Sequence, residues 1–356
     1  MNEIELLRTL VNINSDSYNT EGLEKVLCSI KTACGPALRI KTERKNGHPF
    51  MVIENDPSDT KRSFALVGHI DTVFPENFAP FSMSGTMMRG PGVEDMKSGI
   101  VMMLSLMRSF AGSRNLKLRA LINSDEETGS KDSLGFLRKY TKDIDAAFVF
   151  EGVTEKQGII VKRKGITEVL VEAQGKAAHA GTYFDKGVNA IAKLFHVYGN
   201  LKNDRFFKKE GVSLNLARIN GGGKLNIVPD RAHMWFDFRS FSTSDFLNMR
   251  KRFARARTGG IKMTVYDKRP PLPGGKTGKY SAILKMEYEK AGETFSLDST
   301  GGASDANFIS TFGIPVLDGL GPRGGGDHTE KEFTLLGSFK KRLSAFRAFL
   351  EYFEKK

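Results

Sequence analysis

The sequence has few cysteines and no long hydrophobic run. Cys28 and Cys34, the only two cysteines among 356 residues, form neither a disulfide framework nor a zinc motif at this spacing. The longest apolar stretch starts at Ile100 and reaches Phe110 only with polar interruptions, short of the roughly 18 to 20 residues that cross a bilayer. The N-terminal MNEIELLRTL lacks the basic and apolar regions of a signal peptide. We therefore expect a cytoplasmic protein without a membrane partner.

The sequence also lacks a clear nucleic-acid-binding motif, although 54 basic and 41 acidic residues give a net charge of +13. The densest basic cluster lies on a predicted helix and consists of Arg250, Lys251, Arg252, Arg255 and Arg257. No aromatic side chains alternate with this cluster to stack on bases. We expect solvated helix faces and no nucleic-acid partner; a nucleic-acid-binding protein is an alternative that rests on net charge alone.

The composition is otherwise that of a globular protein. The length of the chain suggests about two domains. Short apolar runs of strand length alternate with helical patterns. The runs are 64–67, 118–122, 146–150 and 314–317, and the helical patterns are 21–33, 96–110 and 133–140. This alternation predicts an α/β fold with a mostly parallel central sheet flanked by helices.

The middle of the chain has a different order. Strand patterns occur at 166–173, 212–219, 231–239 and 261–266, with helical patterns at 187–201 and 242–257. The order β-α-β-β-α-β is typical of a ferredoxin-like α+β sandwich, and the proline- and glycine-rich stretch 268–275 has the composition of a linker. We expect an inserted lid domain at 166–267 within a discontinuous catalytic domain at 1–165 and 268–356.

Acidic and imidazole side chains follow the apolar runs. The residues are His69 and Asp71 after the first run, Asp125, Glu126 and Glu127 after the second, Glu151 after the third, and Asp327 and His328 in the loop after the fourth. Ligands bind beyond the carboxyl ends of the strands in open α/β sheets. These side chains, together with Asp95 before a helical pattern, should therefore meet at one edge.

Two imidazoles and several carboxylates in one crevice need a cation to hold them. Mixed nitrogen and oxygen ligands suit zinc, and cobalt or manganese fit the same ligands. Five candidates are too many for one open tetrahedral site, so we expect two metal ions, which would lower the pKa of a bridging water so that hydroxide exists near neutral pH. Glu126 and Glu127 diverge in an extended stretch, so that one can bind metal while the other faces substrate.

Six motifs resemble one known family. They are GHIDTV, GPGVEDMKSG, DEETGS, VFEG, GKAAHAG and GGASDA with GGGDHTEKE. Their order and spacing are similar to the aminoacylase/glutamate carboxypeptidase family of co-catalytic zinc peptidases, and the bacterial glutamate carboxypeptidase branch is the most similar. The resemblance implies a zinc-exopeptidase-type catalytic domain.

The resemblance also implies roles for individual residues. The two implied metal sites are His69, Asp95 and Glu151 for one ion, and Asp95, Glu127 and His328 for the other. Asp95 would bridge the ions, Glu126 would be the general base, and Asp71 would orient His69. Family members often have a cis peptide after the bridging aspartate, here Asp95–Met96.

For the substrate, the resemblance implies that His179 stabilises the oxyanion, often across a dimer interface. It implies Asn226 and Arg239 as anchors of a substrate carboxylate, with Gly302 and Ser304 in a loop of backbone donors beside them. Guanidinium suits this task because it binds carboxylate with two parallel hydrogen bonds. We expect a homodimer formed through the lid domain.

These features together predict a di-zinc hydrolase that cleaves the amide bond next to a free amino-acid carboxylate. Family members with glutamate at the position of Glu151 tend to be carboxypeptidases or deacylases, so the expected substrate is a small peptide or N-acyl amino acid, with glutamate a candidate product. An N-acyl-amino-acid deacylase of the acetylornithine deacetylase type is the first alternative, and an aminopeptidase is the second. A catalytically silent homologue is disfavoured because Glu126 and every proposed ligand are present.

Overall fold

The computed structural model describes residues 2–76, 78–154, 156, 158–275 and 277–356. Its chain divides into two compact units. Unit 1 comprises Met1–Val161, Gly274–Ser299 and Ser304–Lys356, and unit 2 comprises Lys162–Pro273 and Thr300–Ala303. Unit 2 contains the predicted insertion at 166–267, and its boundaries lie a few residues further out.

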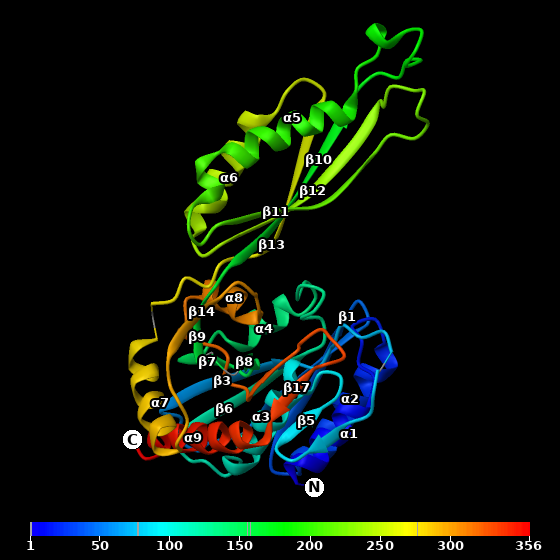
Figure 1. Ribbon diagram of the computed structural model, residues 1–356. Helices are drawn as coiled ribbons and strands as arrows, with labels where there is room; N and C mark the ends of the chain where they lie inside the picture. The colour runs from blue at the N-terminus through cyan, green and yellow to red at the C-terminus, as the bar shows by residue number, and fades with distance from the viewer. Residues whose placement is uncertain (1, 77, 155, 157, 276) are drawn as a thin grey trace. The chain divides into compact units, whose positions relative to one another are not determined.

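Unit 1 is built on a six-stranded sheet (Figure 1). In spatial order the strands are β1 (Arg39–Lys45), β2 (His48–Glu54), β6 (Leu116–Asn123), β3 (Arg62–His69), β7 (Ala146–Val149) and β15 (Val316–Leu317). The last four are parallel to one another, whereas β1 and β2 form an antiparallel edge hairpin. The predicted mostly parallel sheet is confirmed, and the β1–β2 hairpin is an addition to it.

Helices flank this sheet and bury its apolar side chains. They are α1 (Glu3–Asn12), α2 (Thr20–Cys34), α3 (Ser98–Ser109), α4 (Leu134–Tyr140), α7 (Gly278–Lys290), α8 (Asp305–Ile309) and α9 (Leu336–Glu354), with a short π-helix η1 (Val93–Lys97) and a short 3₁₀ helix η4 (Ser310–Phe312). Asn19 caps the start of α2 through a hydrogen bond to the amide of Gly22. In the core, Phe64 of β3 meets Phe148 and Phe353 edge to face, at centroid distances of 5.3 and 5.1 Å.

A second sheet in unit 1 consists of very short strands. In spatial order they are β4 (Ser82–Ser84), β5 (Met87–Arg89), β17 (Phe333–Leu335), β16 (Arg323–Gly325) and β8 (Val153–Thr154); elsewhere β14 (Leu297–Thr300) pairs with β9 (Ile159–Arg163). Strands of two or three residues show no periodicity, so the sequence did not predict this sheet. It places the segment after β16 beside the segment after β5.

Unit 2 has the predicted order of elements. Its antiparallel sheet runs β11 (Ser213–Gly221), β12 (Arg231–Ser240), β10 (Gly165–Gln174) and β13 (Ile261–Arg269), accompanied by α5 (Ala190–Asn203), α6 (Thr243–Ala256), η2 (Phe184–Lys186) and η3 (Arg205–Lys208). The predicted linker at 268–275 is wrong at its start, because β13 continues to Arg269, which pairs with Ile166. Pro270 and Pro271, which have no amide hydrogen, follow the end of the strand.

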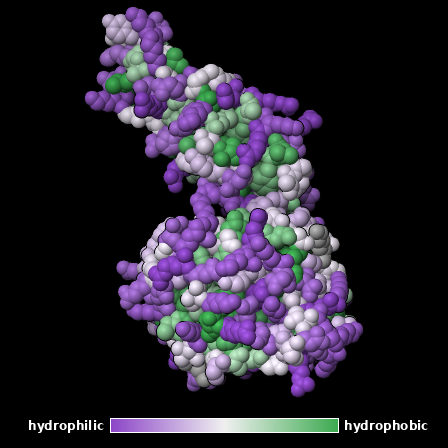
Figure 2. Space-filling model, turned by 180° about the vertical axis from the view of Figure 1, so that it is seen from behind, coloured by the Kyte–Doolittle hydropathy of each residue, from purple (hydrophilic) through white to green (hydrophobic). Residues whose placement is uncertain are grey.

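The net charge is distributed unequally between the units. Unit 2 contains 22 of the lysines and arginines and nine of the acids, whereas unit 1 contains 32 of each. The basic surplus, which has no single focus along the sequence, therefore belongs wholly to unit 2. Figure 2 shows polar residues over most of one face, with small apolar patches between them. Among the described residues, no helix is long and apolar enough to cross a membrane.

Candidate metal centre

Three parallel strands of unit 1 end at one edge of the sheet and carry the predicted ligands there. His69 is the last residue of β3 and pairs in register with Asn123, the last residue of β6. Glu127 follows β6 by four residues, and Glu151 follows β7 by two. Near-continuous buried residues in these strands hold this arrangement, because helices cover the sheet.

The His69 ring is buried and held by Asp71. Its Nδ1 atom lies 3.1 Å from the backbone oxygen and 3.3 Å from Oδ1 of Asp71. The Asp71 carboxylate also accepts hydrogen bonds from the hydroxyl of Ser17 at 2.8 Å and from the amides of Glu126 and Glu127 at 3.2 and 3.0 Å. Asp71 thus orients the imidazole and the backbone that carries both glutamates.

Asp95 lies between two histidines that are far apart in the sequence. Its Oδ1 atom is 3.0 Å from Nε2 of His69, and its Oδ2 atom is 3.2 Å from Nε2 of His328. The peptide bond between Asp95 and Met96 is cis, as the resemblance implies. Each carboxylate oxygen therefore faces a different imidazole, which is the placement that a bridging ligand needs.

Two glutamates complete the two groups. Oε1 of Glu151 lies 3.7 Å from Nε2 of His69, and Oε2 of Glu127 lies 3.3 Å from Nε2 of His328. Ligand atoms of His69, Asp95 and Glu127 all lie within 4.8 Å of one another. The structure thus brings all five proposed metal ligands together.

Burial and crowding shift the pKa values of this cluster. Burial, with the charges of Asp95 and Asp318, raises the pKa of Glu151 to about 7, and burial beside Asp95 also raises the pKa of Glu127. Hydrogen bonds to Asp95 and Glu127 raise the pKa of His328 to about 11. Without cations, the carboxylates and imidazoles therefore share protons.

The donor set fits divalent cations. Two imidazole nitrogens and three carboxylates suit zinc and similar metals, and the two groups share Asp95 as two metal sites would. Cations at these positions would replace the shared protons and balance carboxylates that otherwise repel one another in a buried site.

Cation affinity is expected to rise with pH. Binding needs neutral imidazoles and ionised carboxylates, but at pH 7 His328 is protonated and Glu151 is partly so. Each displaced proton should make binding tighter by about tenfold per pH unit. Calorimetric titration of the metal-free protein with Zn²⁺ at pH 6, 7 and 8, in buffers of different ionisation enthalpy, measures both affinity and proton release. Affinity that does not change with pH would contradict this picture of the cluster.

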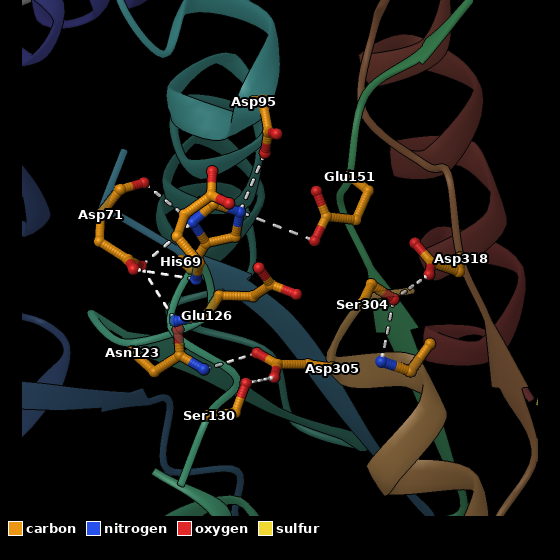
Figure 3. Close-up of polar contacts among 12 residues, drawn as sticks. His69, Asp71, Asp95, Asn123, Glu126, Ser130, Glu151, Ser304, Asp305 and Asp318 are labelled. Atoms are coloured by element: carbon orange, nitrogen blue, oxygen red, sulfur yellow. Dashed lines mark hydrogen bonds and ion pairs between the residues drawn. The ribbon is translucent and has the colours of Figure 1, made fainter. Parts of the chain in front are cut away.

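Glu126 extends past His69 toward the side on which Glu151 lies (Figure 3). The residue is only 8% exposed, and its amide donates to Asp71. The adjacent Glu127 faces His328 instead. The two neighbouring glutamates therefore point in different directions.

His179 and Asn226 lie together at one end of unit 2. His179 bridges to Ile227, and the amide of Ala180 donates to the backbone oxygen of Asn226 at 2.9 Å. Nδ1 of His179 accepts hydrogen bonds from the amides of Gly181 and Thr182 at 3.2 and 3.1 Å. Because Nδ1 is the acceptor, the proton of the neutral ring is on Nε2. The exposed imidazole thus offers an N–H donor.

Arg239 lies near the end of β12 that is farther from His179 and Asn226. Its guanidinium donates to both oxygens of Asp237 at 2.9 and 3.1 Å and to the backbone oxygen of Gly301 at 3.2 Å. Gly302, the next residue, is exposed, so Arg239 and the predicted glycine loop adjoin one another.

Ser304, a predicted substrate contact, lies at the start of α8. The residue is fully buried and caps α8, with its hydroxyl donating to Asp318 at 2.5 Å and its amide donating to Asn307 at 2.9 Å. The hydroxyl and the amide of Ser304 are therefore occupied within unit 1.

The structure adds three acids to which the sequence assigned no role: Asp305, Asp318 and Glu332. Asp305 accepts hydrogen bonds from Asn123 and Ser130, both at 2.5 Å, and so fixes the loop that carries Glu126 (Figure 3). Asp318 directly follows β15, so the expectation that ligands bind beyond the carboxyl ends of the strands applies to it as well. Glu332 lies in a quoted motif, and its carboxylate accepts hydrogen bonds from backbone amides of the Asp95 segment, which no sequence pattern indicates.

A family model described as peptidase family M20/M25/M40 matches residues 65–352. Among curated proteins, carboxypeptidase G2 of Pseudomonas sp. (strain RS-16) is 28% identical over 360 residues, covering 96% of this chain and 86% of that protein. Succinyl-diaminopimelate desuccinylase of Pelagibacter ubique (strain HTCC1062) is 24% identical over 396 residues, covering 98% of each.

Solved structures share the fold. A tripeptidase from Staphylococcus aureus subsp. aureus Mu50 superimposes with a TM-score of 0.85 at 21% identity, and an M20 family metallo-carboxypeptidase from Sulfolobus solfataricus does so with 0.82 at 17% identity. Both comparisons cover 100% of each chain. At these identities the similarity shows the fold alone.

Proposed function

This chain belongs to peptidase family M20/M25/M40, a family of metallopeptidases and amidohydrolases, and we propose that it cleaves the amide bond next to a free amino-acid carboxylate. The observation that carries this proposal is the placement of Asp95 between His69 and His328, with Glu126 beside them. Similarity to carboxypeptidase G2 over nearly the whole chain supports a carboxypeptidase-like reaction that releases a C-terminal amino acid, with glutamate as a candidate.

The proposed cofactors are two Zn²⁺ ions. His69, Asp95 and Glu151 would hold one ion, and Asp95, Glu127 and His328 the other. When bound, such a pair supplies Lewis acidity and lowers the pKa of a coordinated water toward neutrality.

Glu126 is proposed as the general base. Its carboxylate would accept a proton from the attacking water and later donate a proton to the leaving nitrogen. Asp71 supports this role because its carboxylate holds the amides of Glu126 and Glu127, so that Glu126 stays beside the ligands without becoming one.

Arg239 is proposed to bind the free carboxylate of the substrate. Asp237 keeps the guanidinium in a fixed plane, which reduces the entropy lost on binding. Gly302 would offer its backbone amide beside it. The net positive charge of unit 2 supports the proposal, since it attracts anionic substrates at low ionic strength.

His179 and Asn226 are proposed to act on the active site of a second subunit. From Arg231 to Arg239, β12 extends for roughly 26 Å at about 3.3 Å per residue. Both proposed trans residues lie beyond the Arg231 end, so one small substrate cannot touch them and Arg239 of the same chain. A homodimer formed through unit 2 would supply them in trans.

Exposed apolar side chains around His179 support such a dimer. Phe184, five residues after His179, is 67% exposed, and Leu225, directly before Asn226, is fully exposed. Large apolar side chains exposed together commonly mark a protein–protein interface.

An N-acyl-amino-acid deacylase is the second candidate function. Several desuccinylases are similar to this chain, one of them over 98% of its length. Deacylation and C-terminal release involve the same bond type and differ in the group on the acyl side. An aminopeptidase is the third candidate function and is less favoured.

A substrate panel tests the proposed function. Zn²⁺-loaded protein would be incubated with N-acyl amino acids and dipeptides, and with matched compounds whose C-terminal carboxylate is replaced by an amide, while the released amino acid is quantified. The proposal predicts cleavage of the free acids and about 100-fold or greater loss with the matched amides, because a neutral amide lacks the charge and the second acceptor oxygen that a carboxylate offers to Arg239. Cleavage of both at equal rates would contradict it.

A further inference from the structure

Glu332 directly precedes β17, and its carboxylate is directed at the segment that carries Asp95. The residue is 1% exposed. Its Oε2 atom accepts a hydrogen bond from the amide of Gly92 at 2.8 Å, and its Oε1 atom accepts from the amides of Glu94 and Asp95 at 2.8 and 3.1 Å. One buried side chain therefore holds three backbone donors around a proposed bridging ligand.

The same residue ends the turn that carries His328. The amide of Thr329 donates to Gly326 at 3.0 Å, and the amide of Glu332 donates to Thr329 at 3.2 Å, so the turn between them is closed. Strand pairing of Phe333 with Arg89 then fixes β17 against β5. His328 and Asp95 thus come from two segments that meet at Glu332.

The segment around Gly92 depends on this contact. Gly92 has a φ of 73°, and a Cβ atom there would lie 2.7 Å from Cγ2 of Thr72. Glycine is therefore required, and it provides little conformational restraint of its own. The carboxylate of Glu332 supplies the restraint from outside the segment.

We infer that Glu332 is a positioning residue for the metal centre, which keeps Asp95 and His328 at the separation that one shared cation requires. This inference rests on the proposed metal pair. Partners that orient metal ligands commonly change metal affinity or activity by about 10- to 100-fold when mutated. Glu332 acts on the backbone of one ligand and on the turn of another, and it does not touch the cation itself.

Glu332→Gln is the informative substitution because it keeps the size of the side chain. The glutamine side chain has one acceptor oxygen and one donor NH₂ group. Both carboxylate oxygens of Glu332 now accept backbone N–H groups, so in the variant the NH₂ group would face at least one of these donors. Glu330→Gln is the matched control, since Glu330 is exposed in the same turn. Glu332→Asp, which keeps the charge but shortens the reach, serves if Glu332→Gln does not fold.

The test is titration of metal-free protein with Zn²⁺ against a chromophoric chelator, and with Co²⁺ followed by visible absorption. We expect Glu332→Gln to weaken the less tightly bound cation by about 10- to 100-fold and to alter the Co²⁺ spectrum, with kcat reduced and KM nearly unchanged. Glu332→Asp should give a smaller effect in the same direction, and Glu330→Gln none.

A merely structural role would lower the melting temperature but leave both cation affinities of the folded protein unchanged. Wild-type affinities and an unaltered Co²⁺ spectrum in folded Glu332→Gln, or in folded Glu332→Asp if the first variant does not fold, would overturn the inference. Because metal binding is measured without substrate, failure of the substrate panel would leave this result intact. Binding of fewer than two cations by the wild type would overturn both.

Discussion

Replacing Glu126 with glutamine is expected to lower kcat by about 10²- to 10⁴-fold, which is the usual contribution of a general base. Glutamine keeps the size of the side chain but cannot accept the proton. Both cations should stay bound, because Glu127, not Glu126, faces His328. The measurement is kcat on the best substrate of the panel, paired with metal content by elemental analysis.

Glu127→Gln is the matched control for Glu126→Gln. It changes the neighbouring residue in the same way, but it removes a proposed ligand, so metal content should fall together with turnover. If Glu126→Gln retained turnover near the wild-type level, Glu126 would not be the base. If it lost metal as Glu127→Gln does, Glu126 would belong among the ligands.

His179→Ala is expected to lower kcat by about 10²- to 10³-fold, as the loss of one oxyanion donor does. The proposed dimer makes a sharper prediction for mixtures. A dimer with Glu126→Gln in one subunit and His179→Ala in the other has one site with both residues intact, if His179 acts in trans. Random mixing of equal amounts should then restore about one quarter of the wild-type activity, because half of the dimers are mixed in a twofold assembly.

Subunits would be exchanged under mild denaturing conditions, refolded, and assayed beside the unmixed variants. His196→Ala is the control, since His196 is an exposed histidine on α5 of the same unit and should leave activity unchanged. Inactive mixtures with confirmed subunit exchange would contradict action in trans. A monomer on a sizing column would contradict the dimer itself.

The clustering of the candidate ligands could be predicted from the sequence because most of them obey a general rule of open α/β sheets. His69 and Glu151 follow buried apolar strands, and side chains in that position converge at one edge. His328 lies in the loop after the fourth apolar run and was expected at the same edge, whereas Asp95 precedes a helical pattern. The family resemblance supplied the roles of both. The central sheet and the ferredoxin-like unit were predictable for a related reason, namely that long strands show clear apolar patterns.

Other parts of the fold had weaker or overlooked signals. The β1–β2 hairpin turns at Asn46-Gly47, where both residues have positive φ, and this dipeptide is a strong hairpin signal. The sheet that contains β5 and β17 has strands of three residues, which are too short for a periodic pattern. Glu332 acts on backbone amides, and any backbone segment offers such donors, so only the structure identifies its partners.

The most direct test of the proposed centre is the number of cations bound per chain in the wild type and in Asp95→Asn, measured by elemental analysis after dialysis against Zn²⁺. Asp143→Asn, a change at the Arg119–Asp143 ion pair elsewhere in unit 1, is the control. Two cations per wild-type chain and per control chain, with fewer than one in Asp95→Asn, are predicted because a bridging carboxylate serves both sites. Two cations retained in Asp95→Asn would show that Asp95 does not join the sites and would contradict the proposed centre.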